Sequence, residues 1–440
     1  MAFSRLGSRS LHADFLGGRI TTDAGVLLLR EVARRTGLFD ALDRAIPDPR
    51  LPEMIRHRQK SLLAQRITAI ALGYEDLNDH QALRSDPALQ IAADKLPDPD
   101  DPLASPPTLC RLENRVDREA LFRIAEVLLD QFIASHDTPP DSLILDFDAT
   151  DDPVHGQQEG RFFHGYYDHH CFLPLYVFCG DELLVAYLRP SKIDAAKHSR
   201  AILKLLVGKL RRAWPGVKIT FRGDSGFCRR KMMRWCDSNG IGYVLGLARN
   251  SKLEALAIDW TARARRQFER TGQPQRLFGS IGYAAGSWDR SRRVIVKAEH
   301  NAGGANPRFV VCNVPGDPQE LYDDVFCRRG EMENRIKEQQ LGLFADRTSC
   351  HRFVANAFRL LLSSAAYVLI QALRREALSE TELAVAQVGT IRLKLLKVAA
   401  RVLVSVRRVR LHLASGYPYQ ECFEQAWRRL MGLSPSVEAG

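Results

Sequence analysis

The stretch Leu143–Pro153, LILDFDATDDP, decides the fold predicted for this chain. An apolar run of strand type carries two alternating acids, Asp146 and Asp148, and ends in two more, Asp151 and Asp152. Successive side chains of a strand point to opposite faces, so Asp146 and Asp148 are expected to share one face. Ligands of open sheets gather beyond the ends of the strands, and the end of this strand therefore becomes a candidate site.

The residues that follow alternate between strand and helix patterns. Two apolar strands flank a turn at Gly180–Asp181, and an amphipathic helix is expected over 194–214. A further strand ends at Asp224, a helix stops at Gly240, and a fifth strand comes next. This order predicts an α/β fold in which helices cover the faces of a mixed sheet.

The composition indicates a polyanionic partner. The 440 residues include 63 Lys and Arg against 52 Asp and Glu, a net charge of +11. Such an excess favours nucleic acid over an anionic membrane, with a merely solvated positive surface as the alternative. The apolar run Phe353–Leu373 contains Arg359 and polar residues, which predicts a buried helix and not a membrane span.

The nine cysteines and the N-terminus point to a reducing compartment. The cysteines are scattered singly without a CxxC pair, which argues against a zinc finger. The first fifteen residues lack the apolar segment of a signal peptide. We therefore expect reduced thiols and a cytoplasmic protein.

Three acids are placed where a metal site would need them. Asp148 and Asp224 end predicted strands, and Glu333 lies on a predicted helix. Carboxylates that converge do not readily stay ionised together without a cation. Hard oxygen ligands select Mg²⁺ or Mn²⁺, and a pair of such ions serves phosphodiester chemistry. Taken singly, each acid has a plainer interpretation, such as a turn cap or, for Glu333, a surface ion pair with Arg329 or Lys337.

These acids resemble the motifs of the Asp-Asp-Glu transposases of bacterial insertion sequences, of the group 1 type. The first motif, an Asp followed closely by Thr, fits Asp148-Ala-Thr150, and the second fits Asp224-Ser-Gly226-Phe. The third motif has the pattern Tyr-x2-Arg-x3-Glu-x6-Lys, and its positions fall on Phe326, Arg329, Glu333 and Gln340. Phe for Tyr and Gln for Lys are departures, for which Lys337 or Arg335 are possible substitutes. Asp146 is the rival for the first acid, and the motif register favours Asp148.

The resemblance implies a ribonuclease-H-like core that is interrupted by a β-rich insertion, with α-helical N-terminal and C-terminal regions. The 109 residues from Asp224 to Glu333 leave room for that insertion. The expected regions are a helical DNA-binding region (1–95), a linker and long helix (96–140), the first part of the core (141–248), the insertion (249–317), the second part with the Glu helix (318–375) and a basic helical region (376–440).

The resemblance also implies an activity, which is cut-and-paste DNA transposition. Asp148, Asp224 and Glu333 would hold two Mg²⁺ ions, or Mn²⁺. The expected partners are the terminal inverted repeats and target DNA, bound by a homodimer in the bacterial cytoplasm and nucleoid. No membrane partner is expected. No nucleotide cofactor is expected either, since no GxxxxGK[ST] motif occurs. The alternatives are a metal-dependent endonuclease of the same fold, a DNA-binding relative without catalysis, and a recombinase that forms a covalent protein–DNA adduct.

Basic and aromatic side chains supply candidate DNA contacts. For Arg222, pairing with an acid is an equal alternative, and for Trp288 the alternative is covering a small β core. The candidates are Arg56, Arg58, Lys60, Arg222, Trp288, Arg290, Arg292, Arg293, Arg329 and Lys337.

Overall fold

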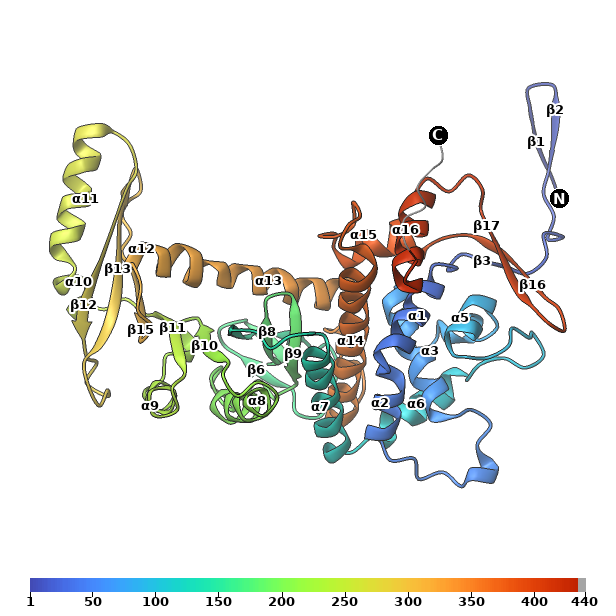
Figure 1. Cartoon of the computed structure of the whole chain (residues 1–440), viewed down its shortest axis with the longest axis horizontal. Coiled ribbons are helices and arrows are strands. Elements are labelled where there is room, and N and C mark those ends of the chain that lie inside the picture. The colour runs from blue at the N-terminus through green and yellow to red at the C-terminus, as the bar shows by residue number, and fades with distance from the viewer. Residues whose placement is uncertain (434–440) are drawn as a thin grey trace. The chain divides into compact units, whose positions relative to one another are not determined.

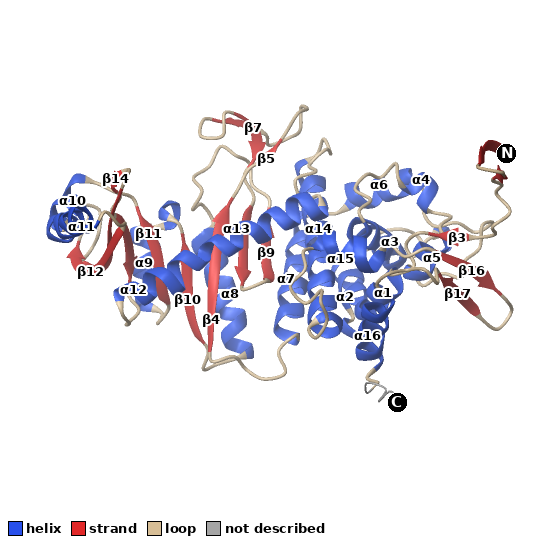
Figure 2. Ribbon diagram, turned by 90° about the horizontal axis from the view of Figure 1, so that it is seen from above, coloured by secondary structure: helices blue, strands red, loops and turns tan. Residues whose placement is uncertain are grey.

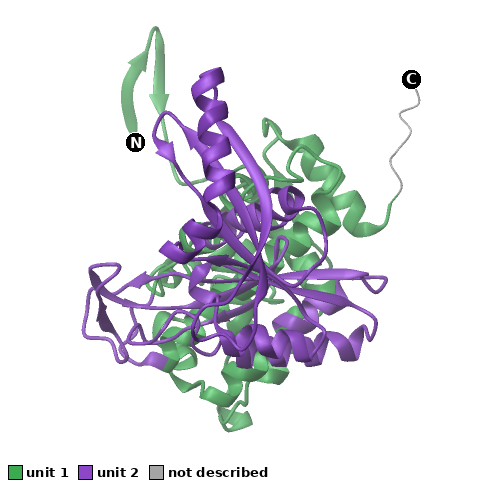
Figure 3. Ribbon diagram, turned by 90° about the vertical axis from the view of Figure 1, so that its left-hand side faces the viewer, with its two compact units in different colours: residues 1–127, 338–347, 354–440 green, residues 128–337, 348–353 purple. Residues whose placement is uncertain are grey.

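The computed structural model describes residues 1–433, which fold into two compact units (Figure 3). We call them the helical unit and the sheet unit. The helical unit contains Met1–Val127, Glu338–Arg347 and the chain from Val354 onward, and the sheet unit contains Leu128–Lys337 and Thr348–Phe353. Residues 434–440, the end of the predicted region 376–440, lie outside the described residues.

The sheet unit is built on a mixed sheet (Figure 1). The central strand β4 pairs antiparallel with β8 and parallel with β10, and β10 pairs parallel with β11. In chain order the five core strands lie third, second, first, fourth, fifth, which is the ribonuclease-H-like arrangement and confirms the predicted fold class. The strands are β4 (Ser142–Ala149), β8 (Leu175–Cys179), β9 (Glu182–Tyr187), β10 (Lys218–Gly223) and β11 (Gly242–Leu247).

Helices cover both faces of this sheet. Figure 1 shows α8 (Ser199–Ala213) and α9 (Arg230–Ser238) on one side and α13 (Gly330–Lys337) on the other. The alternation of β4 explains which residues face which layer. Leu145 and Phe147 belong to the apolar core that also contains residues of α8 and α9, so the intervening acids face the side of α13.

The insertion forms the predicted antiparallel strands and extends the core sheet. Its strand β15 pairs antiparallel with β11, so the β order continues β12-β13-β15-β11. Two helices precede these strands and were not predicted. Asn250 starts the first of them by accepting a hydrogen bond from the Leu253 amide at 3.0 Å. The elements are α10 (Ser251–Leu256), α11 (Ile258–Thr271), β12 (Gln275–Tyr283), β13 (Arg292–Asn301), β14 (Gly304–Ala305) and β15 (Arg308–Cys312).

The predicted Glu helix begins soon after β15. Asp317 starts it by accepting hydrogen bonds from the amides of Gln319 and Glu320. After α12 (Pro318–Glu320) the helical path widens into the π-helix η3 (Leu321–Phe326) and then tightens into the 3-10 helix η4 (Cys327–Arg329), which leads into α13. A small second sheet of β5 (Asp152–Pro153), β6 (Phe162–His164) and β7 (His169–Phe172) lies between β4 and β8 in the chain.

The helical unit packs its helices around a shared core. Most of α14 is buried, as predicted for this apolar segment. Among residues 1–433, Phe353–Leu378 alone is long and apolar enough to cross a membrane, and 83% of its most apolar window is buried inside the protein. The helices are α1 (Val26–Thr36), α2 (Leu38–Ala45), η1 (Pro52–Met54), α3 (Gln59–Leu72), α4 (His80–Leu83), α5 (Pro87–Ala92), α6 (Pro106–Arg115), η5 (Glu338–Gly342), α14 (Phe353–Leu373), η6 (Arg374–Leu378), α15 (Val388–Ile391), η7 (Arg392–Leu396) and α16 (Gln420–Met431).

The long helix predicted from Thr108 is two helices. The first, α6, starts at Pro106, and the second is α7 (Arg118–Ala134). Asp117 separates them because its carboxylate accepts a hydrogen bond from the Ala120 amide at 2.8 Å and so caps the second helix.

Both ends of the chain contain strands where helices were predicted. The N-terminal residues form β1 (Ala2–Leu6), β2 (Arg9–His12) and β3 (Ile20–Thr21). The basic C-terminal region contains the hairpin β16 (Ala400–Val404) and β17 (Val409–Leu413). The prediction of helix failed because these segments have only two to five residues each, which is too short for a helical or strand period to be recognised.

Candidate active site

The first two candidate acids lie at the ends of neighbouring parallel strands. The register pairs Arg222 of β10 with Asp146 of β4, and Gly223 with Phe147. The next positions along the two strands are Asp224 and Asp148. The backbone turns directly after β10, where the carboxylate of Asp224 accepts a hydrogen bond from the Gly226 amide at 2.8 Å.

Helix α13 brings the third acid to the same side of the sheet (Figure 2). The guanidinium of Arg329 connects the helix to β4. It donates to Asp148 Oδ2 at 3.3 Å and to Glu333 Oε1 at 2.7 Å. Asp148 and Glu333, which are 185 positions apart in the sequence, therefore share one cation.

Asp148 lies in an electrostatically unfavourable environment for a carboxylate. Burial is the largest cause and raises its pKa from 3.8 to about 7. The positive charge of Arg329 opposes this rise in pKa, while the charges of Asp224 and Glu333 add to it. The site therefore contains more negative charge than the Arg329 guanidinium compensates.

Asp146 has a different partner, although it shares a face with Asp148. Arg222 contacts both of its carboxylate oxygens, with Nη2 at 2.5 Å from Oδ2, and also donates to the carbonyl of Val325. Burial raises the pKa of Asp146, and Arg222 opposes that rise. Arg222 is itself buried, so the structure favours the predicted alternative of an internal ion pair over a DNA contact.

The donor atoms of this site suit a hard divalent cation, since all are carboxylate oxygens. Among residues 1–433, however, no group of three or more His, Cys, Asp or Glu side chains is close enough to hold a metal ion. Arg329 contacts the two carboxylates from which such an ion would gain ligands. The residues fit the ion by their chemistry, but their described positions do not enclose it.

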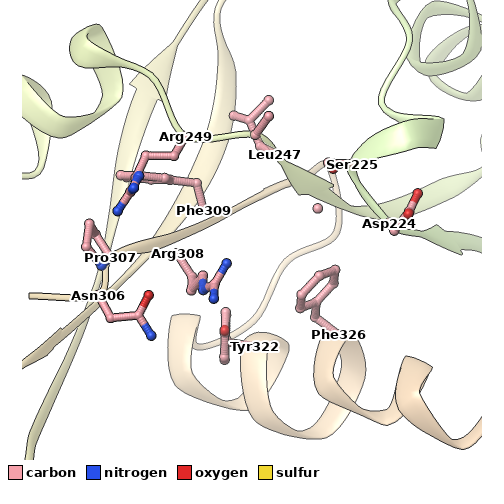
Figure 4. Close-up of a pocket in the computed structure, with 12 residues that line it drawn as sticks. Asp224, Ser225, Leu247, Arg249, Asn306, Pro307, Arg308, Phe309, Tyr322 and Phe326 are labelled. Atoms are coloured by element: carbon pink, nitrogen blue, oxygen red, sulfur yellow. The ribbon is translucent and has the colours of Figure 1, made fainter. Parts of the chain in front are cut away.

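A cavity of about 510 Å³ opens beside Asp224 (Figure 4). Gly246 at the end of β11 makes room for it, because a Cβ there would lie 2.9 Å from the Ser225 amide nitrogen and 3.3 Å from the Phe326 ring. The wall is both aromatic and basic. It consists of Asp224, Ser225, Gly246, Leu247, Ala248, Arg249, Asn306, Pro307, Arg308, Phe309, Tyr322 and Phe326.

The cavity contains a tyrosine that the motif comparison missed. Phe326 occupies the tyrosine position of the third motif, and Tyr322 lies one helical turn earlier. Their ring centroids are 5.7 Å apart, and both side chains line the cavity. The spacing of four residues on a helix was the available signal.

The three candidate arginines of the insertion all have partners within the protein. Arg292 is buried, where it pairs with Asp237 and Asp289 and donates to the Tyr243 hydroxyl at 2.8 Å. This burial leaves little of the Arg292 side chain accessible for the predicted DNA contact, which stays a prediction. Arg293 donates to the carbonyls of Val314 and Gly316, and the exposed Arg290 pairs with Asp237 at 2.7 Å.

Trp288 packs against the core of the sheet unit. It is partly buried, and its ring meets that of Tyr283 edge to face at 5.3 Å between centroids. The structure therefore favours the alternative in which this side chain covers the β core.

The remaining candidate contacts are accessible. Lys337 is exposed, whereas Arg335, the other possible substitute in the third motif, pairs with Asp181 at 2.5 Å. In the helical unit Arg58 is exposed, Arg56 lies 3.8 Å from Asp101 and Lys60 pairs with Asp40 at 2.6 Å. The DNA contacts of Lys337, Arg56, Arg58 and Lys60 stay predictions.

Comparison with known proteins identifies the family. No curated protein matches the chain. The chain is similar to the piggyBac transposase in a cryo-EM structure of its synaptic complex with hairpin DNA, with a TM-score of 0.43 and 10% sequence identity over 96% of this chain and 84% of that chain. Residues 3–435 match the family model described as transposase DDE domain group 1. Because this match spans nearly the whole sequence, the chain belongs to the group 1 DDE transposase family.

Proposed function

We propose that this chain cuts DNA at the ends of an insertion sequence and joins the freed ends to target DNA. The carboxylates of Asp148, Asp224 and Glu333 would carry the reaction by binding divalent ions, for which Mg²⁺ is the first choice and Mn²⁺ the second. The observation behind this proposal is that Asp148 and Glu333 share the Arg329 guanidinium, while the pKa of the buried Asp148 is still raised to about 7. Such a site favours additional positive charge.

The chain's own residues would have distinct tasks. Asp148 and Asp224 are fixed by strand ends, and Glu333 is delivered by α13. Two divalent ions held by these carboxylates would supply activation of a water or a 3′-hydroxyl and stabilisation of the leaving oxygen. Arg329 would exchange its two carboxylates for a DNA phosphate, which a guanidinium binds with the same fork of donors.

The proposed partner is double-stranded DNA, as terminal inverted repeats and as target, bound by a homodimer. The net charge of +11 supports a polyanionic partner. Sedimentation of the full-length chain with a single terminal fragment tests the dimer, since two protein chains per complex are expected.

The decisive experiment incubates the full-length chain with Mg²⁺ and DNA that carries the inverted repeats flanking its gene. Cleaved and joined products are resolved on sequencing gels. We expect both to disappear in Asp148→Asn, Asp224→Asn and Glu333→Gln, with DNA binding retained in fluorescence anisotropy. Persistent cleavage in these variants overturns the assignment.

Glu331→Gln is the matched control. Glu331 is an exposed acid on the same helix, two residues before Glu333, and it has no place in the proposed site. Its substitution should leave both products unchanged. A loss of products equal to that in Glu333→Gln would show that any change on this helix impairs the reaction, and would give the Glu333 carboxylate no special role. Cleavage without joining in the unmodified chain would identify an endonuclease of the same fold.

A further inference from the structure

The feature that the proposed reaction does not use is a basic hairpin, which we define as residues 400–413. It consists of β16, β17 and the turn 405–408 (Figure 1). The turn is ordered by its own hydrogen bonds. The Ser405 amide donates to the Arg408 carbonyl at 2.9 Å, and the Ser405 hydroxyl accepts from the Arg408 amide at 3.2 Å.

The base of the basic hairpin is anchored in the helical unit. β16 pairs with β3, which places Ala400 opposite Thr21. Ala400 belongs to a small buried cluster with Ala24 and Val398, and Leu411 packs against it. The distal half has no such cover, since Val404 and Val409 are each 38% exposed. The hairpin is therefore fixed at one end and free at the other.

Its charges are all of one sign. No Asp or Glu occurs from residue 383 to residue 420. The exposed basic side chains of the hairpin are Arg401, Arg407, Arg408, Arg410 and His412. Among residues 1–433 none of these five side chains forms an ion pair, whereas Asp146, Asp148 and Glu333 of the sheet unit each have an arginine beside them.

The strand register sorts these side chains by face. Directly opposed residues of an antiparallel pair lie on the same face. Arg401 opposes His412, and Leu403 opposes Arg410, so one face is basic. Val406 in the turn is fully exposed and contributes nothing to the core.

We propose that the basic hairpin is a second DNA-binding element, which inserts into a groove of duplex DNA and sets its arginines against the phosphates. The inference rests on the proposed function only in taking DNA as the partner. A two-stranded antiparallel ribbon fits the major groove, which is about 12 Å wide. Unpaired arginines gain most from a polyanion, because binding releases condensed counterions. A second copy of this acid-free hairpin would be repelled.

The test compares two double variants of the full-length chain. Arg407→Ala/Arg408→Ala removes the two tip charges of the hairpin. Arg200→Ala/Arg212→Ala removes two exposed arginines of α8 that form no ion pair within residues 1–433, and it serves as the matched control. The dissociation constant for a duplex fragment is measured by anisotropy between 50 and 200 mM salt.

We expect the hairpin variant to bind at least about tenfold more weakly at low salt. The slope of log K against log salt should fall by about 2, since each lost phosphate contact contributes about 0.9. Arg407→Lys/Arg408→Lys should keep the slope, because lysine preserves the charge. The control should retain the affinity and slope of the unmodified chain.

Unchanged affinity in the hairpin variant, or an equal loss in the control, overturns the inference. If DNA binding is unchanged while sedimentation shows altered self-association, the hairpin is a contact between chains. The proposed function fails separately. It fails when the acid variants still cleave, whatever the salt slope of the hairpin variant.

Discussion

The candidate active site and the basic hairpin are both dense in charge, but only the first pairs charges of opposite sign. Asp146 pairs with Arg222, and Asp148 and Glu333 share Arg329. The arginines of the hairpin have no ion pairs among the described residues. Buried charges need partners within the fold, whereas exposed charges without partners remain available for a ligand.

Breaking the buried pair should give the largest effect. Arg222→Ala leaves the Asp146 carboxylate buried without a cation, which we expect to cost about 3–5 kcal/mol of unfolding free energy. Urea unfolding followed by circular dichroism measures it. Arg222→Met combined with Asp146→Leu should recover much of the loss, because it removes both charges. A loss below about 1 kcal/mol for Arg222→Ala would contradict the statement that the buried Asp146 carboxylate depends on its partner.

The pH dependence of stability tests the uncompensated charge at Asp148. Its folded-state pKa is about 7, against 3.8 ordinarily, so the folded state binds more protons between these values. Stability should therefore fall as the pH rises from about 4 to about 7, by on the order of 4 kcal/mol in the absence of metal. Unfolding in EDTA across this range measures the slope. Asp148→Asn should flatten the dependence of the unfolding free energy on pH. Parallel curves for the variant and the unmodified chain would show that another group causes this dependence.

Removing Arg329 should strengthen metal binding. Arg329→Ala deletes the cation that contacts Asp148 and Glu333, so a divalent ion no longer competes with it. We expect about tenfold tighter binding of Mg²⁺ in calorimetry, equal to about 1.4 kcal/mol. Arg329→Lys should lie between the two, because it keeps the charge without the fork. Weaker binding in Arg329→Ala would mean that the arginine organises the acids instead of competing for them.

The smallest effect is expected where charges have no partners. Arg407→Ala/Arg408→Ala should change the unfolding free energy by no more than about 0.5 kcal/mol, since exposed side chains outside the core, helix caps and buried ion pairs contribute little. The same urea titration used for Arg222→Ala measures it. A substantial loss would show that the arginines of the turn support the fold and would remove the contrast between the two regions.

The sequence predicted the core because its signals reinforce one another. Strand ends, turn residues and three spaced acids agreed on the order of β4, β10 and the Glu helix. It could not show which arginines are buried, because Arg222 and Arg292 look alike to a pattern search and acquire partners only in the fold. The partner of Arg292, Asp237, lies on α9, 55 residues earlier in the chain.

The errors at the ends of the chain have a similar cause. A segment of five residues such as β16 has no period of its own long enough to distinguish strand from helix. Its pairing with β17 and β3 settles the matter, and that pairing joins residues from opposite ends of the sequence. Tyr322 was missed for another reason. A motif specifies the residue at a single position, whereas the wall of the cavity combines Tyr322 with Phe326 from the next helical turn.

The pairing of β15 with β11 makes the insertion part of the architecture of the core. An excised core, in which residues 249–317 are replaced by a short linker, would leave β11 with a row of unpaired amide and carbonyl groups. Such an open edge recruits strands from other molecules. The insertion is consequently no removable accessory, and a minimal catalytic fragment of this chain has to retain at least β15 to remain soluble.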